Sequence, residues 1–216
     1  MTSTATGPRW RRRADARPQE LLDAALGVFV ERGYAATRLE EVAQRAGVAK
    51  ATLYRYYENK LELFKAVVRN SLVVGFDEFT RSAADPAPTA RERIVRMLSD
   101  FMARVAGSAL AGIPKLVIAE ASNFPEVARF YHEEVILRAR ARVLDALAEG
   151  TASGEFRAVD ADYAWRVIVA PLLLSIVWMR SFQAFEPEPF DARRHLNAQL
   201  DLLFNGLAVH DKRNRR

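Results

Sequence analysis

Residues 37–60 read TRLEEVAQRAGVAKATLYRYYENK, in which two short helical patterns lie on either side of a single glycine. Thr37 can cap the first helix, and Glu40, three residues later, can complete a capping box. Gly47 follows, and glycine readily takes the left-handed conformation in which a chain leaves a helix. Apolar residues recur at helical spacing before it, at Leu39, Val42, Ala43 and Ala46. This stretch therefore predicts a helix-turn-helix.

The second pattern, KATLYRYY at residues 50–57, has an unusual outward face. Leu53 points inward, with Tyr57 as a second inward candidate, and the other positions face solvent. Their hydroxyls, cations and flat rings suit a phosphate backbone and base edges. A glycine between two short helices also occurs in plain helical bundles, so it is this face that favours DNA binding. Asn59 then begins another helix, with Lys60 in its first turn, where the ammonium can bind a phosphate.

Residues 37–63 resemble the DNA-binding segment of the tetracycline-repressor (TetR) family of bacterial regulators. In that family a threonine opens the second helix, AGV makes the turn, TLYRYY-like residues form a short recognition helix, and a lysine begins the fourth helix. The resemblance implies DNA contacts at Thr37, Lys50, Ala51, Thr52, Tyr54, Arg55, Tyr56 and Lys60. Two positions depart from the pattern. Ala49 stands where a capping serine is usual, and Arg38 replaces a second hydroxyl residue with a charge that either reaches a phosphate or stays solvated.

The charge of the chain is concentrated at one end. Of its 216 residues, the first 70 hold 13 Lys and Arg against 8 Asp and Glu, whereas residues 71–216 hold 19 of each. A positively charged end on a neutral remainder is the distribution expected of a DNA-binding protein. The sequence contains no cysteine, which excludes disulfides and cysteine-ligated metals and fits a cytoplasmic location.

The sequence predicts an all-α protein, because no alternating strand pattern of useful length occurs in it. A first helix is expected from Arg17 to Gly33. The helix that begins at Asn59 is expected to run on toward Phe79 and to leave the DNA-binding part. Further helices are expected near residues 94–105, 116–121, 127–147, 160–185 and 191–209, with a break at 107–114.

Four segments follow from this pattern. They are a basic arm at 1–14, a helix-turn-helix domain at 15–64, a helical effector-binding and dimerisation domain at 65–210, and a basic tail at 211–216. The arm is expected to be disordered; it either adds phosphate contacts or is a solvated tail. The longest apolar run, Val167 to Met179, is shorter than the roughly 20 residues that a membrane span needs, so we expect a buried helix.

The TetR resemblance also implies a homodimer, in which the two C-terminal helices of each chain form a four-helix bundle. Two heads about 34–36 Å apart could then read successive major-groove faces of a palindromic operator. The helix near residues 160–185 is apolar on too many sides to have a free face, although it could instead be buried within one subunit. The candidate residues for this interface, or for the core beside it, are Leu172, Ile176, Met179, Leu196, Leu200, Leu203 and Leu207.

The resemblance further implies that the middle helices bind a small effector, and residues 115–133, KLVIAEASNFPEVARFYHE, resemble one subset of the family's C-terminal domains. Glu120 shares a helical face with apolar residues, so it is either paired with an arginine or recognises a ligand. Aromatic residues at helical spacing can equally be simple core. The candidate pocket residues are Phe101, Met102, Val117, Glu120, Phe124, Tyr131, Trp165 and Trp178.

The sequence gives no support to catalysis or to a cofactor. His132, His195 and His210 are far apart, and no Gly-rich phosphate loop, serine elbow or zinc-binding histidine pair occurs. We therefore expect a dimeric repressor that a small lipophilic effector releases from its operator, with no metal and no membrane partner. The alternative is a DNA-binding module without an effector, either a constitutive repressor or an architectural protein.

Overall fold

The computed structural model of the chain describes residues 18–73 and 88–207. Both predicted basic tails, residues 1–14 and 211–216, therefore lie outside the described residues. Every regular element within the described ranges is a helix, which confirms the all-α prediction.

The chain divides into two compact units, one ending at Asn70 and the other beginning at Ser71. We call the described part of the first unit the head and that of the second unit the body. The domain boundary expected after residue 64 falls inside a helix of the head, because that helix runs to Val68.

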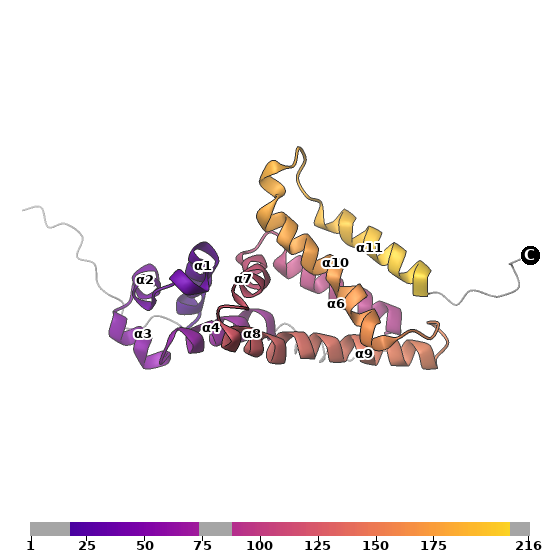
Figure 1. The fold of residues 1–216 in the computed structure, drawn as a ribbon, viewed down its shortest axis with the longest axis horizontal. Helices are drawn as coiled ribbons and strands as arrows, with labels where there is room; N and C mark the ends of the chain where they lie inside the picture. Colours follow the sequence, from indigo (N-terminus) through magenta and orange to yellow (C-terminus); the bar gives the residue numbers. More distant parts are fainter. Residues whose placement is uncertain (1–17, 74–87, 208–216) are drawn as a thin grey trace, which may run out of the picture. The chain divides into compact units, whose positions relative to one another are not determined.

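The head consists of helices α1 (Pro18–Ala36), α2 (Leu39–Arg45), α3 (Lys50–Tyr56) and α4 (Lys60–Val68) (Figure 1). Pro18 begins α1, a position at which its missing N–H leaves no helical bond unmade. Gly33, which was expected to end this helix, has φ 78° and ψ 169°. The helical path therefore breaks at Gly33, and one further turn reaches Ala36.

Three aromatic rings lie at the centre of the head. Phe29 packs edge to face on Phe64, with ring centroids 5.3 Å apart, and stacks on Tyr34 at 5.9 Å. The head residues with no exposed surface are Leu21, Ala25, Val28, Val42, Leu53, Leu63, Phe64 and Val68. Leu53, the predicted inward residue of α3, is thus in the core, where it fixes the orientation of that helix.

The turn between α2 and α3 has the predicted form. Gly47 has φ 69°, a left-handed conformation that side-chain-bearing residues rarely adopt. The Val48 N–H donates to the Ala43 carbonyl at 3.0 Å, and the Val48 side chain is buried in the corner. The structure therefore contains the helix-turn-helix that residues 37–60 predict.

Beyond α4 the chain forms a π-helical turn, η1 (Arg69–Val73). The predicted continuation of this helix toward Phe79 lies outside the described residues, which resume at Pro88. Whether one helix leaves the head for the body therefore stays a prediction.

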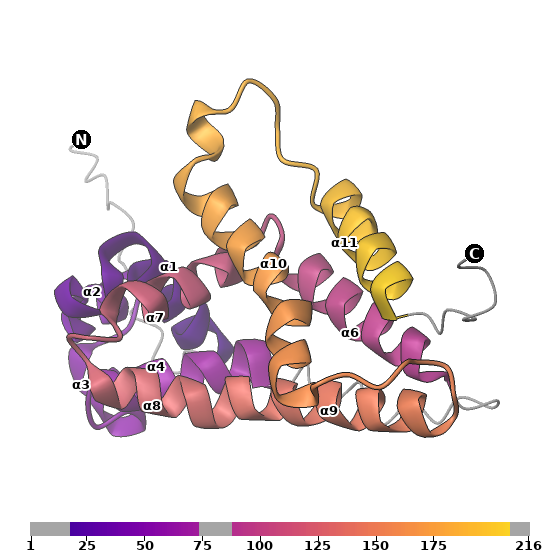
Figure 2. The same ribbon diagram turned by 45° about the vertical axis from the view of Figure 1, so that its right-hand side comes forward.

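The body is built from helices and short helical turns (Figures 1 and 2). In chain order they are α6 (Ala90–Val105), η2 (Ala109–Ala111), α7 (Gly112–Glu120), α8 (Pro125–Tyr131), η3 (His132–Ile136), α9 (Leu137–Ala152), α10 (Ala161–Ser181), η4 (Gln183–Phe185) and α11 (Ala192–Leu207). The break expected at residues 107–114 is shorter than predicted, because Pro114 lies in the first turn of α7, where proline is tolerated.

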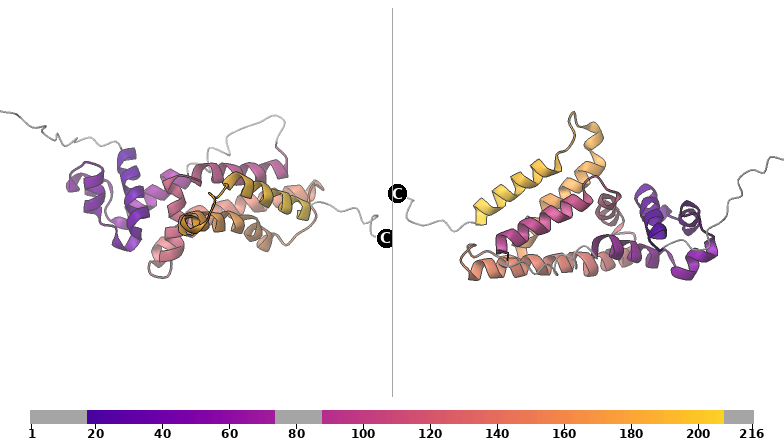
Figure 3. Two further views of the ribbon diagram at one scale, coloured as in Figure 1. Left: turned by 90° about the horizontal axis from the view of Figure 1, so that it is seen from above. Right: turned by 180° about the vertical axis from the view of Figure 1, so that it is seen from behind.

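Helices α8 and α9 form one continuous rod, joined by the π-helical turn η3 (Figures 1 and 3). Helices α6 and α10 pack on α9, and α11 packs on both α6 and α10. The core between them is apolar, and its members with at most 1% exposure are Ile94, Leu98, Val143, Leu147 and Ile168. Helices α6, α7, α9 and α10 surround the middle of the body.

Helix α10 has two different apolar faces. Ile168, Leu172 and Ile176 are buried in the core of the body, whereas Val167 and Leu174 are more than 60% exposed. By length and composition the helix could cross a membrane, but one such helix is also common in the core of a protein. Its most apolar window is only 22% buried within the chain, so burial wholly inside one subunit does not occur, and coverage of the exposed face by a second copy stays a prediction.

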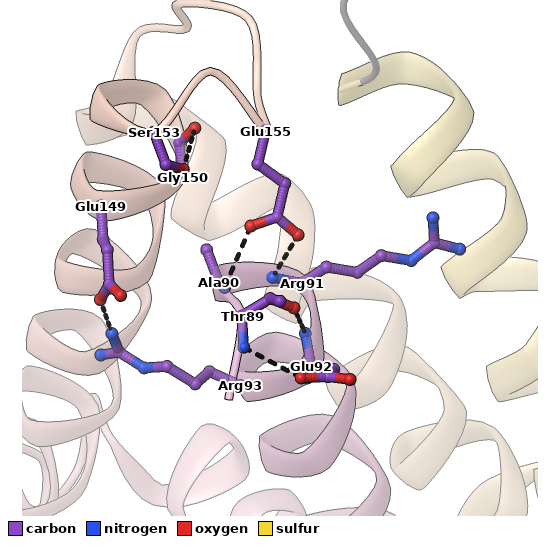
Figure 4. Close-up of polar contacts among 9 residues, drawn as sticks. All are labelled: Thr89, Ala90, Arg91, Glu92, Arg93, Glu149, Gly150, Ser153 and Glu155. Atoms are coloured by element: carbon purple, nitrogen blue, oxygen red, sulfur yellow. Dashed lines mark hydrogen bonds and ion pairs between the residues drawn. The ribbon is translucent and has the colours of Figure 1, made fainter. Parts of the chain in front are cut away.

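The start of α6 is held by two carboxylates (Figure 4). Thr89 and Glu92 form a capping box, in which the Glu92 N–H donates to the Thr89 hydroxyl at 3.2 Å. Glu155, from the loop after α9, accepts from the backbone N–H groups of Ala90 and Arg91, both at 3.1 Å. These amides have no partner inside the helix, and a carboxylate is favourable at this end of the helix dipole. Glu155 thereby connects the start of α6 to the loop that follows α9.

Replacing Glu155 by alanine is expected to lower the free energy of unfolding of the body by about 1–3 kcal/mol, because two amide donors lose their charged acceptor. Urea unfolding followed by circular dichroism measures this loss. The matched control is Glu149→Ala, which removes an ion pair with Arg93 from a side chain that is 55% exposed. That change is expected to cost at most about 1 kcal/mol. Equal losses for the two variants would contradict the special role of Glu155.

Candidate nucleic-acid interface and body cavity

The outward face of α3 carries the predicted aromatic and basic residues. Tyr54 is 42% exposed and Tyr56 is 46% exposed, although both are large rings that would ordinarily be covered. Lys50, Ala51 and Arg55 are also exposed, whereas Thr52 is half-buried. Leu53 is fully buried and fixes the rotation of the helix. The face is therefore available to bind an extended partner such as DNA, whose major groove admits an α-helix.

The rings and cations of this face contact one another. The Lys50 ammonium lies 5.5 Å from the centre of the Tyr54 ring, and the Arg55 guanidinium lies 5.5 Å from that of Tyr56. Tyr57 is half-buried beside them, and burial raises the pKa of its phenol. These contacts limit the rotamers of the side chains before any ligand arrives, which lowers the entropy lost on binding.

The first turn of α3 lacks a side-chain cap. Ala49 occupies the N-cap position and makes no side-chain hydrogen bond, as its departure from the family pattern predicts. Lys50 instead forms an ion pair with Glu40, which projects from the first turn of α2. The Lys50 ammonium lowers the pKa of the Glu40 carboxyl, and Glu40 raises the pKa of Lys50.

Most other cations of the head also have acidic partners. The Arg32 Nε lies 3.1 Å from a Glu41 oxygen, and Arg45 binds both oxygens of Glu31. Arg38 and Arg55 form no ion pair with a described residue of the head. Residues 18–70 hold 8 Lys and Arg against 7 Asp and Glu, whereas residues 1–17 hold 5 against 1. The positive excess of this end of the chain thus belongs mainly to residues 1–17.

Thr37 does not cap α2, so that prediction is wrong. The N-cap of α2 is Arg38, without a side-chain hydrogen bond, and Thr37 lies one residue before it. Thr37 is only 3% exposed, and its hydroxyl donates to the Gly33 carbonyl at 2.6 Å. The break in α1 at Gly33 supplies this acceptor. Thr37 therefore joins the end of α1 to the start of α2, beneath the surface on which the TetR resemblance placed it.

Lys60 is also engaged within the head. Its ammonium donates to the Tyr34 carbonyl at 2.7 Å and to the Ala35 carbonyl at 2.9 Å, and it lies 4.7 Å from the Tyr34 ring centre. Asn59 caps α4 by accepting from the Glu62 N–H at 3.0 Å, as predicted. A phosphate contact by Lys60 stays a prediction. Its removal would also break these two hydrogen bonds between α4 and the end of α1.

The body encloses an apolar cavity of about 190 Å³ between α6, α7, α9 and α10. Four of the eight predicted pocket residues line it, namely Phe101, Val117, Tyr131 and Trp165. Met102 is buried in the adjoining core instead, and Trp178 lines a separate groove that is described below. Glu120 and Phe124, at the end of α7 and just before α8, are half-buried and lie outside the cavity wall. None of the described residues that line this cavity is charged, which suits a lipophilic group.

The π-helical turn η3 shapes one wall of the cavity. Tyr131, Val135, Ile136 and Ala139 all line it, although Val135 and Ile136 are adjacent in the chain. In an α-helix adjacent residues point about 100° apart, whereas the wider π-turn brings positions i and i+5 onto one face. Burial raises the pKa of the Tyr131 phenol, so this side chain stays neutral and can act as a hydrogen-bond donor. Sequence periodicity gives no signal for such a turn.

The predicted interface residues mostly face inward. Leu172, Ile176, Leu196 and Leu207 are at most 6% exposed within one chain, and Met179, Leu200 and Leu203 pack partly buried against the same core. The exposed apolar residues of this region are Val167, Leu174, Trp178, Phe182, Phe185 and Leu202. A groove of about 430 Å³ lies beside them, lined by Ala170, Pro171, Leu174, Ser175, Trp178, Phe190 and His195. The sequence thus identified the apolar helices but not their outward face.

Two family descriptions match separate parts of the chain. Residues 21–67 match the bacterial regulatory proteins of the tetR family. Residues 92–204, more than half of the chain, match the C-terminal domain of AefR-like transcriptional repressors. The first match covers the helix-turn-helix, and the second covers the helices around the cavity.

Individual relatives agree with these matches. The fatty acid metabolism regulator protein of Bacillus subtilis is 26% identical over 196 residues, which cover 89% of this chain and 95% of that protein. The transcriptional repressor KstR2 of Mycobacterium tuberculosis is 28% identical over 169 residues, covering 77% of this chain and 82% of that protein. The transcriptional activator FasR of Mycolicibacterium smegmatis is 45% identical, but over 74 residues, 33% of this chain and 34% of that protein.

Solved structures share the fold at lower identity. The transcriptional regulator FadR from Bacillus subtilis, in complex with stearoyl-CoA, superposes with a TM-score of 0.71 at 22% identity, covering 90% of this chain and all of that one. The ketosteroid regulator KstR2 of Mycobacterium tuberculosis superposes with a TM-score of 0.67 at 24% identity, covering 94% and 100%. At these identities the likeness concerns the fold alone.

Proposed function

We propose that this chain, which belongs to the TetR family of bacterial transcriptional regulators, is a dimeric repressor that leaves a palindromic operator when a lipophilic effector occupies the body cavity. The observation that carries the proposal is the combination of an outward face on α3 that exposes Tyr54, Arg55 and Tyr56 with an apolar cavity in the body. The first feature suits DNA, and the second suits an apolar small molecule.

The DNA contacts proposed for the head are those of the outward face of α3, with Tyr54, Arg55 and Tyr56 at its centre. Neither Arg38 nor Arg55 forms an ion pair with a described head residue. Their guanidinium groups are therefore available to phosphates or to guanine edges. Lys50 and Lys60 already have partners in the head. To contact DNA, each ammonium must either leave its partner or bind the partner and a phosphate together.

The proposed dimer uses the outward faces of α10 and α11. Val167 and Leu174 of α10 and Leu202 of α11 are more than 60% exposed, and contiguous exposed apolar surface marks an interaction site. A second copy covers such a surface with the same residues by twofold symmetry. Two heads held in this way can read two half-sites of a palindrome.

The proposed effector carries a long apolar group. The cavity of about 190 Å³ has an apolar lining, and a relative of the same fold is described with stearoyl-CoA bound. Another structural neighbour is named for ketosteroids, so fused rings are the second candidate. Such an effector can release the operator only if it binds the released conformation more tightly than the DNA-bound one.

The test uses the purified full chain and the intergenic DNA beside its own gene. Footprinting is expected to protect a palindromic site, sedimentation is expected to give a dimer, and stearoyl-CoA or a steroid ester is expected to release the DNA. Protection that neither compound class reverses would favour a DNA-binding module without an effector. The absence of any protected site would contradict the operator.

The place of action follows from the partner. A regulator that binds chromosomal operators works in the cytoplasm at the nucleoid, and we propose this location for the chain. Within the described residues no group of three His, Asp or Glu side chains is placed to hold a metal ion. His132 is exposed on η3, and His195 lies in the groove between α10 and α11. We propose binding without catalysis for both units.

A further inference from the structure

We propose that Glu40 is an internal counterion for Lys50, which competes with DNA phosphate and so sets the affinity and the salt dependence of DNA binding. Neither residue is assigned this role by the family pattern, which concerns Lys50 as a DNA contact and does not involve Glu40. The inference rests on the proposed DNA-binding function of the head. It identifies an affinity-determining residue that itself makes no favourable contact with DNA.

The geometry of the pair carries the proposal. Glu40 lies in the first turn of α2, Lys50 is the first residue of α3, and the turn at Gly47 brings the two together. Their side chains form an ion pair on the outer surface, where Lys50 is 58% exposed and Glu40 is 51% exposed. The ammonium lies 5.5 Å from the centre of the Tyr54 ring, on the outward face of α3. The carboxylate therefore stands at the edge of the surface that DNA must approach.

Glu40 also offsets an unfavourable arrangement in the free head. A cation in the first turn of a helix faces the positive end of the helix dipole, and the N-cap residue Ala49 provides no side-chain acceptor. A carboxylate from α2 neutralises the ammonium at this point. Because both side chains are exposed to water, the pair is weak and exchangeable. A phosphate can therefore take the place of Glu40, which is then left facing the negatively charged backbone.

This exchange has a measurable thermodynamic consequence. A lysine that is free before binding displaces about one condensed counterion from DNA, which adds about 0.9 to the slope of log K against log salt. A lysine that exchanges a carboxylate for a phosphate brings that carboxylate to the DNA as well, so its net contribution is close to zero. Wild-type Lys50 is thus expected to add little to the salt dependence, whereas Lys50 without Glu40 adds its full share.

The experiment measures binding of the full chain to a labelled duplex of random sequence over a series of salt concentrations. Glu40→Gln is expected to bind several-fold more tightly at low salt and to steepen the slope by about 0.9 per head. The variant is isosteric, and its thermal unfolding shows whether the head is intact. In the Glu40→Gln, Lys50→Gln double variant the slope is expected to return to the wild-type value.

Two matched controls remove one negative charge elsewhere on the head. Glu41→Gln frees Arg32, and Glu31→Gln frees Arg45, but neither pair includes a residue of α3. Both variants are expected to change the slope by much less than Glu40→Gln. A Glu40→Gln slope equal to wild type, or the same steepening in the Glu41→Gln control, would overturn the proposal. Failure of the wild type to bind any duplex would instead contradict the DNA-binding function.

Discussion

Replacing Tyr54 by alanine is expected to lower operator affinity roughly 30-fold or more without changing the melting temperature. Tyr54 is 42% exposed and is not one of the core residues of the head, so its loss costs little stability. On DNA, one good base contact is worth about 1–3 kcal/mol, and a dimer loses it in both heads. The expected loss of about 2–6 kcal/mol corresponds to at least that fold-change.

Fluorescence anisotropy with the footprinted operator measures this effect, and circular dichroism measures the melting temperature. Tyr54→Phe separates the ring from the hydroxyl, since it removes only the polar atom. Tyr163→Ala is the matched control, because it takes the same side chain from an exposed position on α10. Operator affinity that survives Tyr54→Ala would remove α3 from the DNA interface.

Replacing Ala139 by tryptophan is expected to abolish release by the effector while operator binding persists. Ala139 lines the apolar cavity together with Ile136 and Trp165, and a second indole would occupy the space that the effector needs. Overpacking of this kind costs about 1–3 kcal/mol of stability, which a folded body of this size can bear. The variant should therefore behave as a repressor that no longer responds.

The measurement follows the operator complex while stearoyl-CoA is added to wild type and variant. Ala141→Trp is the control, because Ala141 is an exposed residue two positions further along α9 and outside the cavity. It is expected to respond like wild type. Release of the Ala139→Trp variant at wild-type effector concentrations would show that the effector binds elsewhere.

The helix-turn-helix could be predicted from the sequence because its signals are local. The helical spacing of the apolar residues, the turn at Gly47 and the outward face of α3 can each be read from a few neighbouring residues. The capping of α2 could not be predicted to the residue. Thr37 is a good cap by type, but the break at Gly33 offers its hydroxyl a backbone carbonyl, and no local pattern indicates that competition.

The site in the body was predictable only in part, because helical spacing reveals an apolar face but not what covers it. Phe101 and Met102 are adjacent in the chain, yet one lines the cavity and the other packs into the core. The π-turn before α9 turns Ile136 toward the cavity, and a fixed period of 3.6 residues places it elsewhere. On α10 both faces are apolar, so composition cannot distinguish core from surface.

The hydrogen bonds from the Lys60 ammonium to the carbonyls of Tyr34 and Ala35 close a loop in the chain. The segment between these residues, which includes α2 and α3, is thereby held together at its two ends. Such a loop has little freedom to bend, so the reading helix cannot tilt without its neighbours. In the proposed mechanism, an effector in the body cavity would therefore move the head as one rigid unit.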